Sequence, residues 1–557
     1  MKKILIFRTA PIEVFARCAE EYANEDITVI VQRSVSSKIS DIVTKIIVSD
    51  KRLSLFSIGI IRFLKLLKFK YDKTIILVNN EGRLGYFDKE LIALLLRTER
   101  IEYYNKNGKF AVLKKRQLIK EYGWLVINRI ILIVSSIYKI LINFFLNFFI
   151  KKKEEYILYL SNAGIDEPIV QSQSITPLNL MVEKGFNFFF VSPEKTDIRF
   201  NYLNQNKIND IREKNRRIDF ISIPYENNLF FYLCRFFSTG ASITVSKKCR
   251  VVHCRNMMPA VTGLFLKYLF SLYFIFDLRG LWVEERETTG ILNPGAYNFQ
   301  GYLNLIIMKL FYRLTLKFSD EIYVITESMK KYIVEKYTLD NNKISVIPTA
   351  ITSDRYLRAK PYKELQGKLA DKIVFGYNGS LVIWQQIDKI LEFFSKIERQ
   401  LPQAFFFIIT MDDIMIVRHK MEQISMERNK YIAVNADFHD VPKYLKLCDF
   451  GILFRDKTDM NKIAFPTKIG EYFICGVAPI VSDGLVEVVK VINKYNSGLS
   501  INIDRDITID DNLKNTIITL KEDAHLKQRC QNAAIEFCDW NAYTHLYEKS
   551  YTKKKGN

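Results

Sequence analysis

Short apolar runs alternate with segments of helical periodicity along most of this 557-residue chain. Runs such as Ile4–Phe7 and Tyr156–Leu160 have the length of buried strands, and each is followed by a stretch of helix-like spacing. The predicted strands are 4–7, 27–31, 46–48 and 74–78; 156–160, 188–191, 219–223, 251–253, 274–277 and 321–326; and 373–379, 405–410, 432–434, 450–454 and 478–481. Strand, helix and strand in this order form parallel sheets covered by helices. The pattern predicts an α/β protein. Apolar residues make up 48% of the sequence, which excludes disorder, collagen and coiled coil as the main state.

The alternation falls into separate regions. A polar stretch at 355–372, which contains Pro361, interrupts it and marks a linker between two lobes of similar size. Two such lobes imply a cleft, and ligands of open parallel sheets bind at the carboxyl ends of the strands. The predicted regions are an accessory Rossmann-like α/β domain at 1–120, a hydrophobic helix at 121–155, a first lobe at 156–355, a second lobe at 356–530, and a final helix with a basic tail at 531–557.

The segment from Trp124 to Ile150 holds only two charges, Arg129 and Lys139. It is long enough to cross a bilayer. However, its polar residues fall on one side of a helix, and lysines flank both ends. This favours an amphipathic helix lying in the membrane interface against anionic headgroups, with a transmembrane helix and a helix buried between domains as alternatives. Arg62, Lys65, Lys68 and Lys70 offer a second basic amphipathic contact in the first domain.

The net charge of +21 favours a polyanionic partner. No nucleic-acid-binding motif accompanies it, so we expect an anionic membrane surface and no nucleic acid. The eight cysteines are scattered without a C-x-x-C pair, which argues against a disulfide framework or a structural zinc site and suits a reducing compartment. The N-terminus has too short an apolar run for a signal peptide. We therefore expect a cytoplasmic protein, peripheral on the inner face of the cell membrane.

The stretch Phe465–Ile480 is the most informative about chemistry. Pro466 and Thr467 stand where a helix begins, so the first amides of that helix and Lys468 form an anion site suited to phosphate. Glu471, one turn further, can accept hydrogen bonds from two vicinal hydroxyls, as on a ribose. The alternative is an ordinary turn from helix to strand with a solvated glutamate.

This stretch resembles the donor-binding signature of family 4 retaining glycosyltransferases of the GT-B fold. Further segments are similar to that family in the same order, and the resemblance covers about 156–545. It implies an α/β fold with two Rossmann-like lobes facing each other (GT-B), preceded here by the small α/β domain and the amphipathic helix. The further segments are Tyr156–Ser161, Val252–Arg255, Phe276–Glu285, Asp320–Met329, Lys343–Thr349 and Phe375–Ser380.

The resemblance also implies roles for individual residues. The expected catalytic residues are His253, Asp277 and Arg279, with a core histidine and a salt bridge inside the lobe as the alternatives. Glu284 and Glu285 are weaker candidates for orienting the acceptor, and no metal site is expected. The expected donor-binding residues are Gly379, Ser380, Arg455, Pro466, Thr467, Lys468 and Glu471.

Two positions depart from the family pattern. Ile463 stands where the family usually has a second glutamate, eight positions before Glu471, that helps to hold the donor sugar. No basic residue follows Gly379 and Ser380, where the family tends to place cations for the diphosphate. Neutralisation of the phosphates then falls to Lys468, with Arg455 or Arg279, and to backbone amides.

The function that the resemblance implies is transfer of a sugar, of the hexosyltransferase class, from a nucleotide-sugar donor with retention of anomeric configuration. The expected acceptor is lipid-linked or a cell-surface glycan, and no cofactor is expected. Because Ile463 replaces a glutamate, a catalytically weakened GT-B scaffold at the membrane is an alternative. Another GT-B nucleotide-sugar enzyme, such as an epimerase, is a further one.

Overall fold

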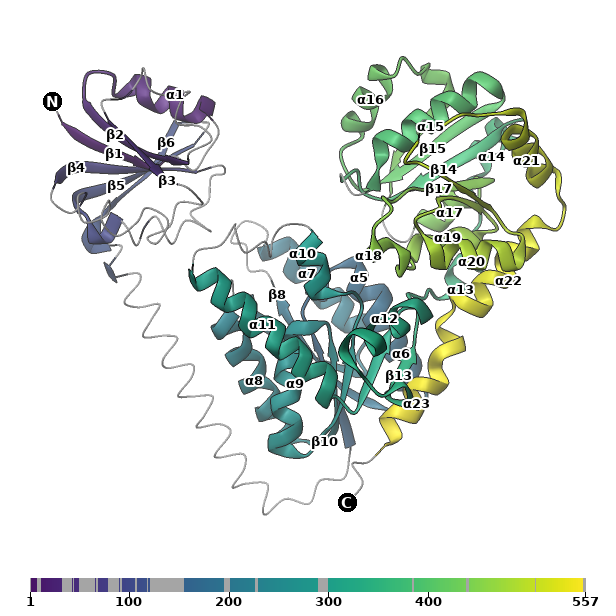
Figure 1. Ribbon diagram of the computed structural model, residues 1–557, viewed down its shortest axis with the longest axis horizontal. Coiled ribbons are helices and arrows are strands. Elements are labelled where there is room, and N and C mark those ends of the chain that lie inside the picture. The colour runs from purple at the N-terminus through teal and green to yellow at the C-terminus, as the bar shows by residue number, and fades with distance from the viewer. Residues whose placement is uncertain are drawn as a thin grey trace. The chain divides into compact units, whose positions relative to one another are not determined.

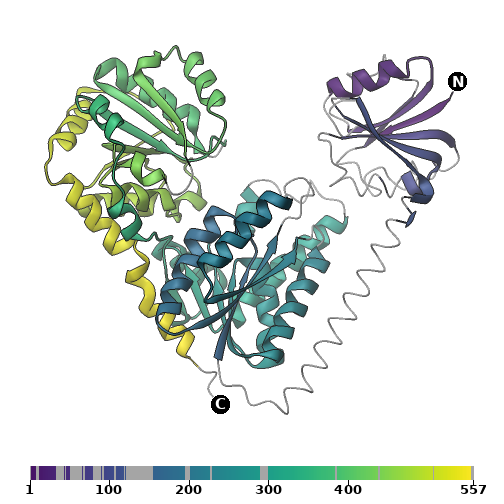
Figure 2. The ribbon, with the colours of Figure 1, turned by 180° about the vertical axis from the view of Figure 1, so that it is seen from behind.

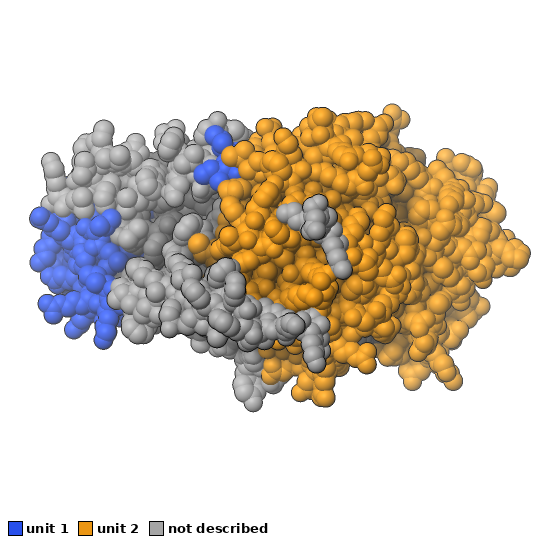
Figure 3. Space-filling model, turned by 90° about the horizontal axis from the view of Figure 1, so that it is seen from below, with its two compact units in different colours: residues 1–135, 289–307 blue, residues 136–288, 308–557 orange. Residues whose placement is uncertain are grey.

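The computed structural model forms two compact units, residues 1–135 with 289–307 and residues 136–288 with 308–557 (Figure 3). The predicted amphipathic helix at 124–150 lies outside the described residues, as do the basic residues Arg62, Lys65 and Lys68. The residues that the structure describes are 2–7, 12–32, 43, 45–49, 66, 69–78, 90, 93–105, 108–117, 119–120, 155–194, 201–225, 229–288, 299–382, 385–436, 440–505 and 507–553.

The first unit contains a six-stranded sheet in the order β3-β2-β1-β4-β5-β6. The first five strands are parallel, and β6 is antiparallel to β5. Helix α1 (Ile12–Glu21) packs on one face through Val14, Phe15 and Cys18. The strands are β1 (Lys3–Phe7), β2 (Asp26–Gln32), β3 (Lys45–Ser49), β4 (Lys70–Leu77), β5 (Arg97–Asn105) and β6 (Gly108–Lys114).

The four predicted strands of this unit are confirmed, whereas β5 and β6 were not predicted. Charged residues in the sequence Arg-Thr-Glu-Arg-Ile-Glu of β5 break up its apolar run. Burial of Thr98, Ile101 and the residues after it comes from pairing with β4 and β6, which no local pattern reveals.

The first lobe of the second unit is a seven-stranded parallel sheet in the order β13-β12-β11-β10-β7-β8-β9 (Figures 1 and 2). All six strands predicted for it are present, and β13 is an additional one. The strands are β7 (Glu155–Ser161), β8 (Asn187–Glu194), β9 (Ile218–Pro224), β10 (Lys248–Arg255), β11 (Tyr273–Asp277), β12 (Glu321–Val324) and β13 (Ile344–Val346).

Helices cover both faces of this sheet, as expected for a parallel sheet with crossover connections. Tyr232, Leu264 and Tyr312, from three of these helices, lie in one apolar core against it. The helices are α5 (Pro168–Val170), α6 (Thr176–Glu183), α7 (Asn201–Lys214), α8 (Leu229–Ser246), α9 (Met257–Phe270), α10 (Trp282–Thr288), α11 (Phe299–Phe318) and α12 (Glu327–Tyr337).

The second lobe is a six-stranded parallel sheet in the order β16-β15-β14-β17-β18-β19. The five predicted strands are confirmed, and β19 is additional. The strands are β14 (Ile373–Asn378), β15 (Ala404–Thr410), β16 (Tyr431–Asn435), β17 (Phe450–Leu453), β18 (Ala478–Ser482) and β19 (Leu499–Ile501). The helices are α15 (Ile387–Gln400), α16 (Ile414–Gln423), α17 (Val441–Leu445), α18 (Asp459–Lys462), α19 (Thr467–Cys475), α20 (Val486–Tyr495) and α21 (Asp511–Glu522).

Two chain passages connect the lobes. The linker forms helices α13 (Ser353–Arg358) and α14 (Lys363–Leu369), and it holds no strand, as predicted. At the C-terminal end, α22 (Leu526–Phe537) packs on the second lobe and α23 (Thr544–Thr552) packs on the first (Figure 1). Between them, Ile351 donates its amide proton to the carbonyl oxygen of Cys538 (2.7 Å) and accepts one from Trp540 (3.1 Å).

Among the helices within the described residues, none combines the length and the apolar character needed to cross a bilayer.

Candidate active site

The predicted phosphate-binding helix start lies at the point where the second sheet changes direction. β14 and β17 are neighbours in that sheet, but the chain leaves them toward opposite edges. Ligands of open parallel sheets bind where two neighbouring strands diverge in this way. Helix α19 connects β17 to β18, and its first residue, Thr467, follows the carboxyl end of β17 by way of α18.

The chain just before α19 contacts the first lobe. The Thr326 hydroxyl donates to the carbonyl oxygen of Ile463 (2.7 Å), and the Thr349 hydroxyl donates to that of Phe465. The Ile463 side chain is buried in the apolar core of the first lobe. The position that carries a glutamate in the resembled family is therefore used here to join the lobes, which places the start of α19 at their boundary.

Lys468 lies over the loop that follows β14. Its ammonium donates to the side-chain carbonyl oxygen of Gln385 (3.0 Å) and lies 5.0 Å from the ring centre of Tyr377. Gly379 in that loop has φ +148°, and a Cβ placed on it would lie 1.9 Å from Lys468 Nζ. The glycine predicted for the loop thus permits both the backbone conformation and the close approach of the lysine.

The side chains of Lys468 and Arg455 bring two positive charges close together at the start of α19. Burial and the positive charge of Arg455 lower the pKa of Lys468 to about 7, although Glu471 acts in the opposite direction. Burial also lowers the pKa of Arg455. The Arg455 backbone is fixed to β18, because its amide donates to Ser482 Oγ (2.9 Å) and its carbonyl oxygen accepts from the same hydroxyl (2.8 Å). An anion entering here would relieve the repulsion between the two cations.

The start of α19 adds backbone donors to this positive charge. Pro466 is the N-cap residue, and no side chain caps the helix. The Ile469 amide donates to the carbonyl oxygen of Pro466 (3.0 Å), which leaves the amides of Thr467 and Lys468 available to an anion at the positive end of the helix dipole. Thr467 and Lys468 are half-buried, so this end of the helix is partly open to solvent.

Glu471 is buried one turn into α19, and its carboxylate is held from two sides. The Tyr356 hydroxyl donates to Oε1 (2.9 Å), and the Asn378 amide donates to Oε2 (2.6 Å). Burial raises the pKa of Glu471 despite these hydrogen bonds. A carboxylate has about four acceptor positions, so both oxygens retain capacity for further donors. Asn378 ends β14, which orients Glu471 toward the carboxyl edge of the sheet.

The loop after β14 is held in place by its neighbours. The Tyr377 hydroxyl donates to the carbonyl oxygen of Ser380 (2.5 Å), and the Leu381 amide donates to Asp412 (2.5 Å). Asp412 therefore fixes this loop, while Asp413 caps α16 by accepting from the Met415 amide (2.9 Å). Within the described residues, no group of three or more His, Cys, Asp and Glu side chains is placed to hold a metal ion.

The three residues expected to be catalytic lie together but are enclosed. His253 and Asp277 are fully buried, with His253 Nε2 3.5 Å from Asp277 Oδ2. His253 Nδ1 is hydrogen-bonded to the Tyr551 hydroxyl of α23 (2.8 Å). The Arg279 guanidinium is paired with Asp277 (2.6 Å) and donates to the carbonyl oxygen of Ile347 (3.1 Å).

This enclosure differs from the expectation that His253 reaches the cleft. Side chains alternate between the two faces along a strand. Val252 and Cys254 pack in the core that α8 and α9 cover, so His253 points to the opposite face, where Tyr547 and Tyr551 of α23 lie. The geometry corresponds to the alternative interpretations, a core histidine and a salt bridge within the lobe. Arg279 is likewise committed to Asp277 and backbone carbonyls, not to a phosphate site.

Glu284 is also part of an internal network. It accepts hydrogen bonds from Lys336 (2.8 Å) and from the hydroxyl of Tyr337 (2.8 Å), both on α12. Glu285 is exposed and approaches Gly280, where an added Cβ would lie 2.5 Å from its carboxylate. Of the two glutamates, only Glu285 is exposed.

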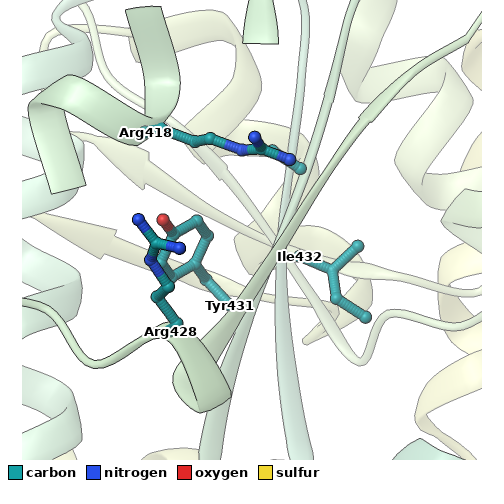
Figure 4. A pocket seen from close by; sticks show the side chains of 5 residues that line it. Arg418, Arg428, Tyr431 and Ile432 are labelled. Carbon is teal, nitrogen blue, oxygen red and sulfur yellow. The ribbon is translucent and has the colours of Figure 1, made fainter. Parts of the chain in front are cut away.

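A separate hollow of about 290 Å³ lies at the edge strand β16 (Figure 4). It shares no residue with the cation site, and one of its arginines, Arg428, is paired with Glu422 (3.2 Å). It therefore adds nothing to the chemistry of α19. Its lining residues are Arg418, Arg428, Tyr431, Ile432 and Ala433.

No protein-family model matches the chain, and no curated protein matches it in sequence. Solved structures match about 70% of it. A glycosyltransferase from Rickettsia africae is 14% identical with a TM-score of 0.55, over 72% of this chain and 98% of that one. HepE from Anabaena, in complex with UDP, is 12% identical with a TM-score of 0.50, over 71% and 99%. Sucrose-phosphate synthase from Thermosynechococcus elongatus is 12% identical with a TM-score of 0.51, over 71% and 98%.

The second unit has the GT-B fold. It consists of two parallel α/β lobes joined by two chain passages, and the three structural neighbours match it over nearly their whole length. At 10–15% identity the likeness concerns the fold alone, and the chemistry rests on the residues of this chain.

Several residues that hold the site were not found from the sequence. Asn378 and Tyr377 stand in the loop segment that carried the resemblance, so a signal for them existed. Tyr356, on the linker helix, and Gln385 had none, because only the folded chain brings them to Glu471 and Lys468. The same is true of Tyr547 and Tyr551 on α23, which cover His253.

Replacing Lys468 by methionine is expected to stabilise the empty protein. The folded-state pKa lies below that of an unfolded lysine, so protonated Lys468 destabilises the fold below pH 10.5, and fully so below pH 7. Differential scanning fluorimetry at pH 7 should show a melting temperature higher by about 2 °C or more. Lys363→Met, at an exposed position of α14, is the matched control and should leave it unchanged. A melting temperature lowered by Lys468→Met would show that the lysine stabilises the empty site.

Binding of a nucleoside diphosphate should weaken as pH rises above 7. Below the free-state pKa, Lys468 already carries its proton. Above that pKa, Lys468 must take up a proton when the anion binds. The Kd should therefore rise toward about tenfold per pH unit between pH 7.5 and 9. Isothermal titration calorimetry in buffers of different ionisation enthalpy measures both the Kd and the proton uptake. In Lys468→Met the slope should disappear, and a slope retained in that variant would assign it to another group.

Replacing Asp277 by asparagine should destabilise the first lobe. Burial opposes the charge of Asp277, but Arg279, His253 and Arg255 outweigh it and hold its pKa below the usual range. Without the carboxylate the arginines lose their buried counter-ion, at a cost of about 3–5 kcal/mol. We expect a lower melting temperature, with unchanged nucleotide affinity. Asp388→Asn, which breaks an exposed ion pair with Lys420, is the control. Loss of activity at an unchanged melting temperature would instead assign Asp277 to catalysis.

Proposed function

We propose that this protein is a glycosyltransferase that moves a sugar from a nucleotide-sugar donor to a lipid-linked or cell-surface glycan acceptor. One observation carries the proposal: Lys468, Arg455 and the free amides of α19 form an anion site, and the buried carboxylate of Glu471 lies one helical turn away. A diphosphate next to a pentose matches that combination of charge and hydrogen-bonding groups. The structural neighbours support it, since HepE has been crystallised with UDP and with UDP and glucose.

The site supports chemistry by positioning and charge stabilisation. When the bond between the anomeric carbon and the diphosphate oxygen breaks, negative charge grows on the leaving diphosphate. Lys468, Arg455 and the α19 amides stabilise that charge where it develops. The acceptor hydroxyl forms the new bond to the anomeric carbon, and its proton passes to the leaving phosphate. Attack from the side of the leaving group would retain the anomeric configuration. None of these steps needs a metal ion.

The membrane and acceptor parts of the proposal come from the sequence. The apolar, lysine-flanked stretch 124–150 and the net charge of +21 favour a peripheral position on the inner face of the cell membrane, where lipid-linked acceptors lie. Ile463 favours one alternative, a nucleotide-binding scaffold, because a carboxylate is missing where the family has one. An epimerase would instead invert a stereocentre of the donor sugar and transfer it to no acceptor.

A nucleotide screen tests the proposal directly. UDP, GDP, ADP and CMP are compared by differential scanning fluorimetry, and one should stabilise the chain by about 2.7 kcal/mol at 100 times its Kd. Glu471→Gln keeps the volume but removes the charge, and it should weaken that nucleotide at least tenfold, as expected for lost hydrogen bonds to a charged group. Glu522→Gln, at an exposed position of α21, is the control.

The outcomes separate the candidates. No response to any nucleotide at millimolar concentration would refute the proposal. Binding without transfer of labelled sugar to a membrane lipid extract would favour the scaffold. An epimerised sugar, free or still attached to the nucleotide, would favour the epimerase.

A further inference from the structure

Three helices of the first lobe carry no acidic residue. α8, α9 and α11, of 18, 14 and 20 residues, contain neither Asp nor Glu. The whole chain has 61 acidic residues among 557, so helices of this combined length would ordinarily hold several. They lie side by side on one face of the seven-stranded sheet (Figure 1). Their charged residues are Arg235, Lys267, Lys309, Arg313 and Lys317.

Large apolar side chains are exposed on α9 and α11. Tyr268, Leu269 and Leu310 are between 54% and 61% exposed, Phe265 is 50% exposed and Phe318 37%. We call these five residues the aromatic face. An amphipathic helix of a soluble protein normally turns such residues inward, and contiguous exposed apolar surface marks a site of contact with another molecule.

Ring contacts show that the aromatic face is continuous across the two helices. The Tyr268 and Phe318 rings meet edge to face at 6.2 Å. The Phe265 ring meets the half-buried Phe311 of α11 at 6.0 Å in the same geometry. The apolar side chains of α9 and α11 therefore contact one another at two places.

Basic side chains border the aromatic face. Arg313 and Lys317 are exposed, and their spacing of three and seven residues from Leu310 puts them on the same side of α11. Lys267 is turned inward, where it is paired with Asp320 (2.6 Å), so it does not contribute. The surface thus offers apolar and aromatic groups flanked by positive charge, with no negative charge on the same helices.

We propose that the aromatic face is a docking surface for the interface of an anionic lipid bilayer. Aromatic and aliphatic groups enter the boundary between headgroups and acyl chains, and Arg313 and Lys317 meet the anionic headgroups. A protein partner would not require acids to be absent from three whole helices, whereas an anionic surface repels each of them. The proposal is independent of the stretch 124–150 and of glycosyl transfer.

Flotation of the full chain with vesicles tests this docking. Vesicles of phosphatidylglycerol and phosphatidylcholine (1:1) are compared with pure phosphatidylcholine. Phe265→Ser/Leu269→Ser/Leu310→Ser should lower the partition coefficient on the anionic vesicles at least tenfold. The matched control is Met411→Ser/Met415→Ser/Ile416→Ser, which removes three apolar groups of similar exposure (46–64%) from the second lobe. Partitioning that is the same for both variants would overturn the proposal.

The charged border is tested in the same way. Arg313→Glu/Lys317→Glu should reduce binding to anionic vesicles and leave binding to phosphatidylcholine unchanged. Lys363→Glu/Lys368→Glu makes the same change of charge at exposed positions of α14 and should have little effect. An equal loss for both pairs would show that only net charge matters, which contradicts a specific surface.

A fluorescent label reports the location without relying on loss of binding. Seven of the eight native thiols are buried, and the half-buried Cys234 of α8 is replaced by serine, so that Leu310→Cys and Met415→Cys in this background can be labelled selectively with an environment-sensitive nitrobenzoxadiazole. Anionic vesicles should shift the Leu310→Cys label to the blue and leave the Met415→Cys label unchanged. A Leu310→Cys label that is already blue-shifted without vesicles would show that another part of the chain, or a second copy, covers the face and would overturn the proposal. Unchanged melting temperatures and nucleotide affinities confirm that the variants are folded.

Discussion

The site depends on two half-buried positive charges held close together. Lys468 and Arg455 are positioned by the start of α19 and the end of β17, and the repulsion between them lowers the pKa of the lysine to about 7. Such an arrangement costs free energy in the empty protein and recovers it when an anion enters. The cost is accepted because the fold is stabilised elsewhere, by the apolar core of the second lobe that surrounds α19. The same repulsion makes the site selective for anions over neutral ligands.

Glu471 shows how the rest of the pocket is prepared. Its two oxygens accept hydrogen bonds from the linker helix and from the end of β14, so the carboxylate does not need to reorganise when a ligand arrives. The linker and the central strand β14 of the second lobe are thereby connected through one side chain. Ile463 performs a comparable task at the lobe boundary, where its side chain fills the core of the first lobe and its carbonyl oxygen accepts from Thr326. A sugar contact usual in the resembled family is exchanged here for contact between the lobes.

The strands and the helix start within the stretch Phe465–Ile480 could be predicted from the sequence, because both depend on residues that are neighbours in the chain. The run Phe405–Ile409 is apolar throughout, and Pro466, Thr467 and Lys468 mark a helix start by their own chemistry. The catalytic interpretation of His253 depended on which face of β10 the side chain occupies, and on what covers that face. The covering helix α23 lies almost 300 residues further along the chain, and no local pattern connects the two. Tyr356 and Gln385 were missed for the same reason.

Net charge illustrates the same difference between composition and placement. The surplus of +21 is visible in the sequence, but it does not say whether the cations surround a ligand, pair with acids or gather on one surface. In the structure many lysines of the second lobe are in ion pairs typical of a solvated exterior, such as Lys396 with Glu392 and Lys430 with Glu398. On α8, α9 and α11 the acids needed for such pairs are absent. A uniform compositional bias would have removed acids from all helices alike, and α12 and α21 retain theirs. An anionic surface next to those three helices explains why they lack acids, and a bias in residue usage does not.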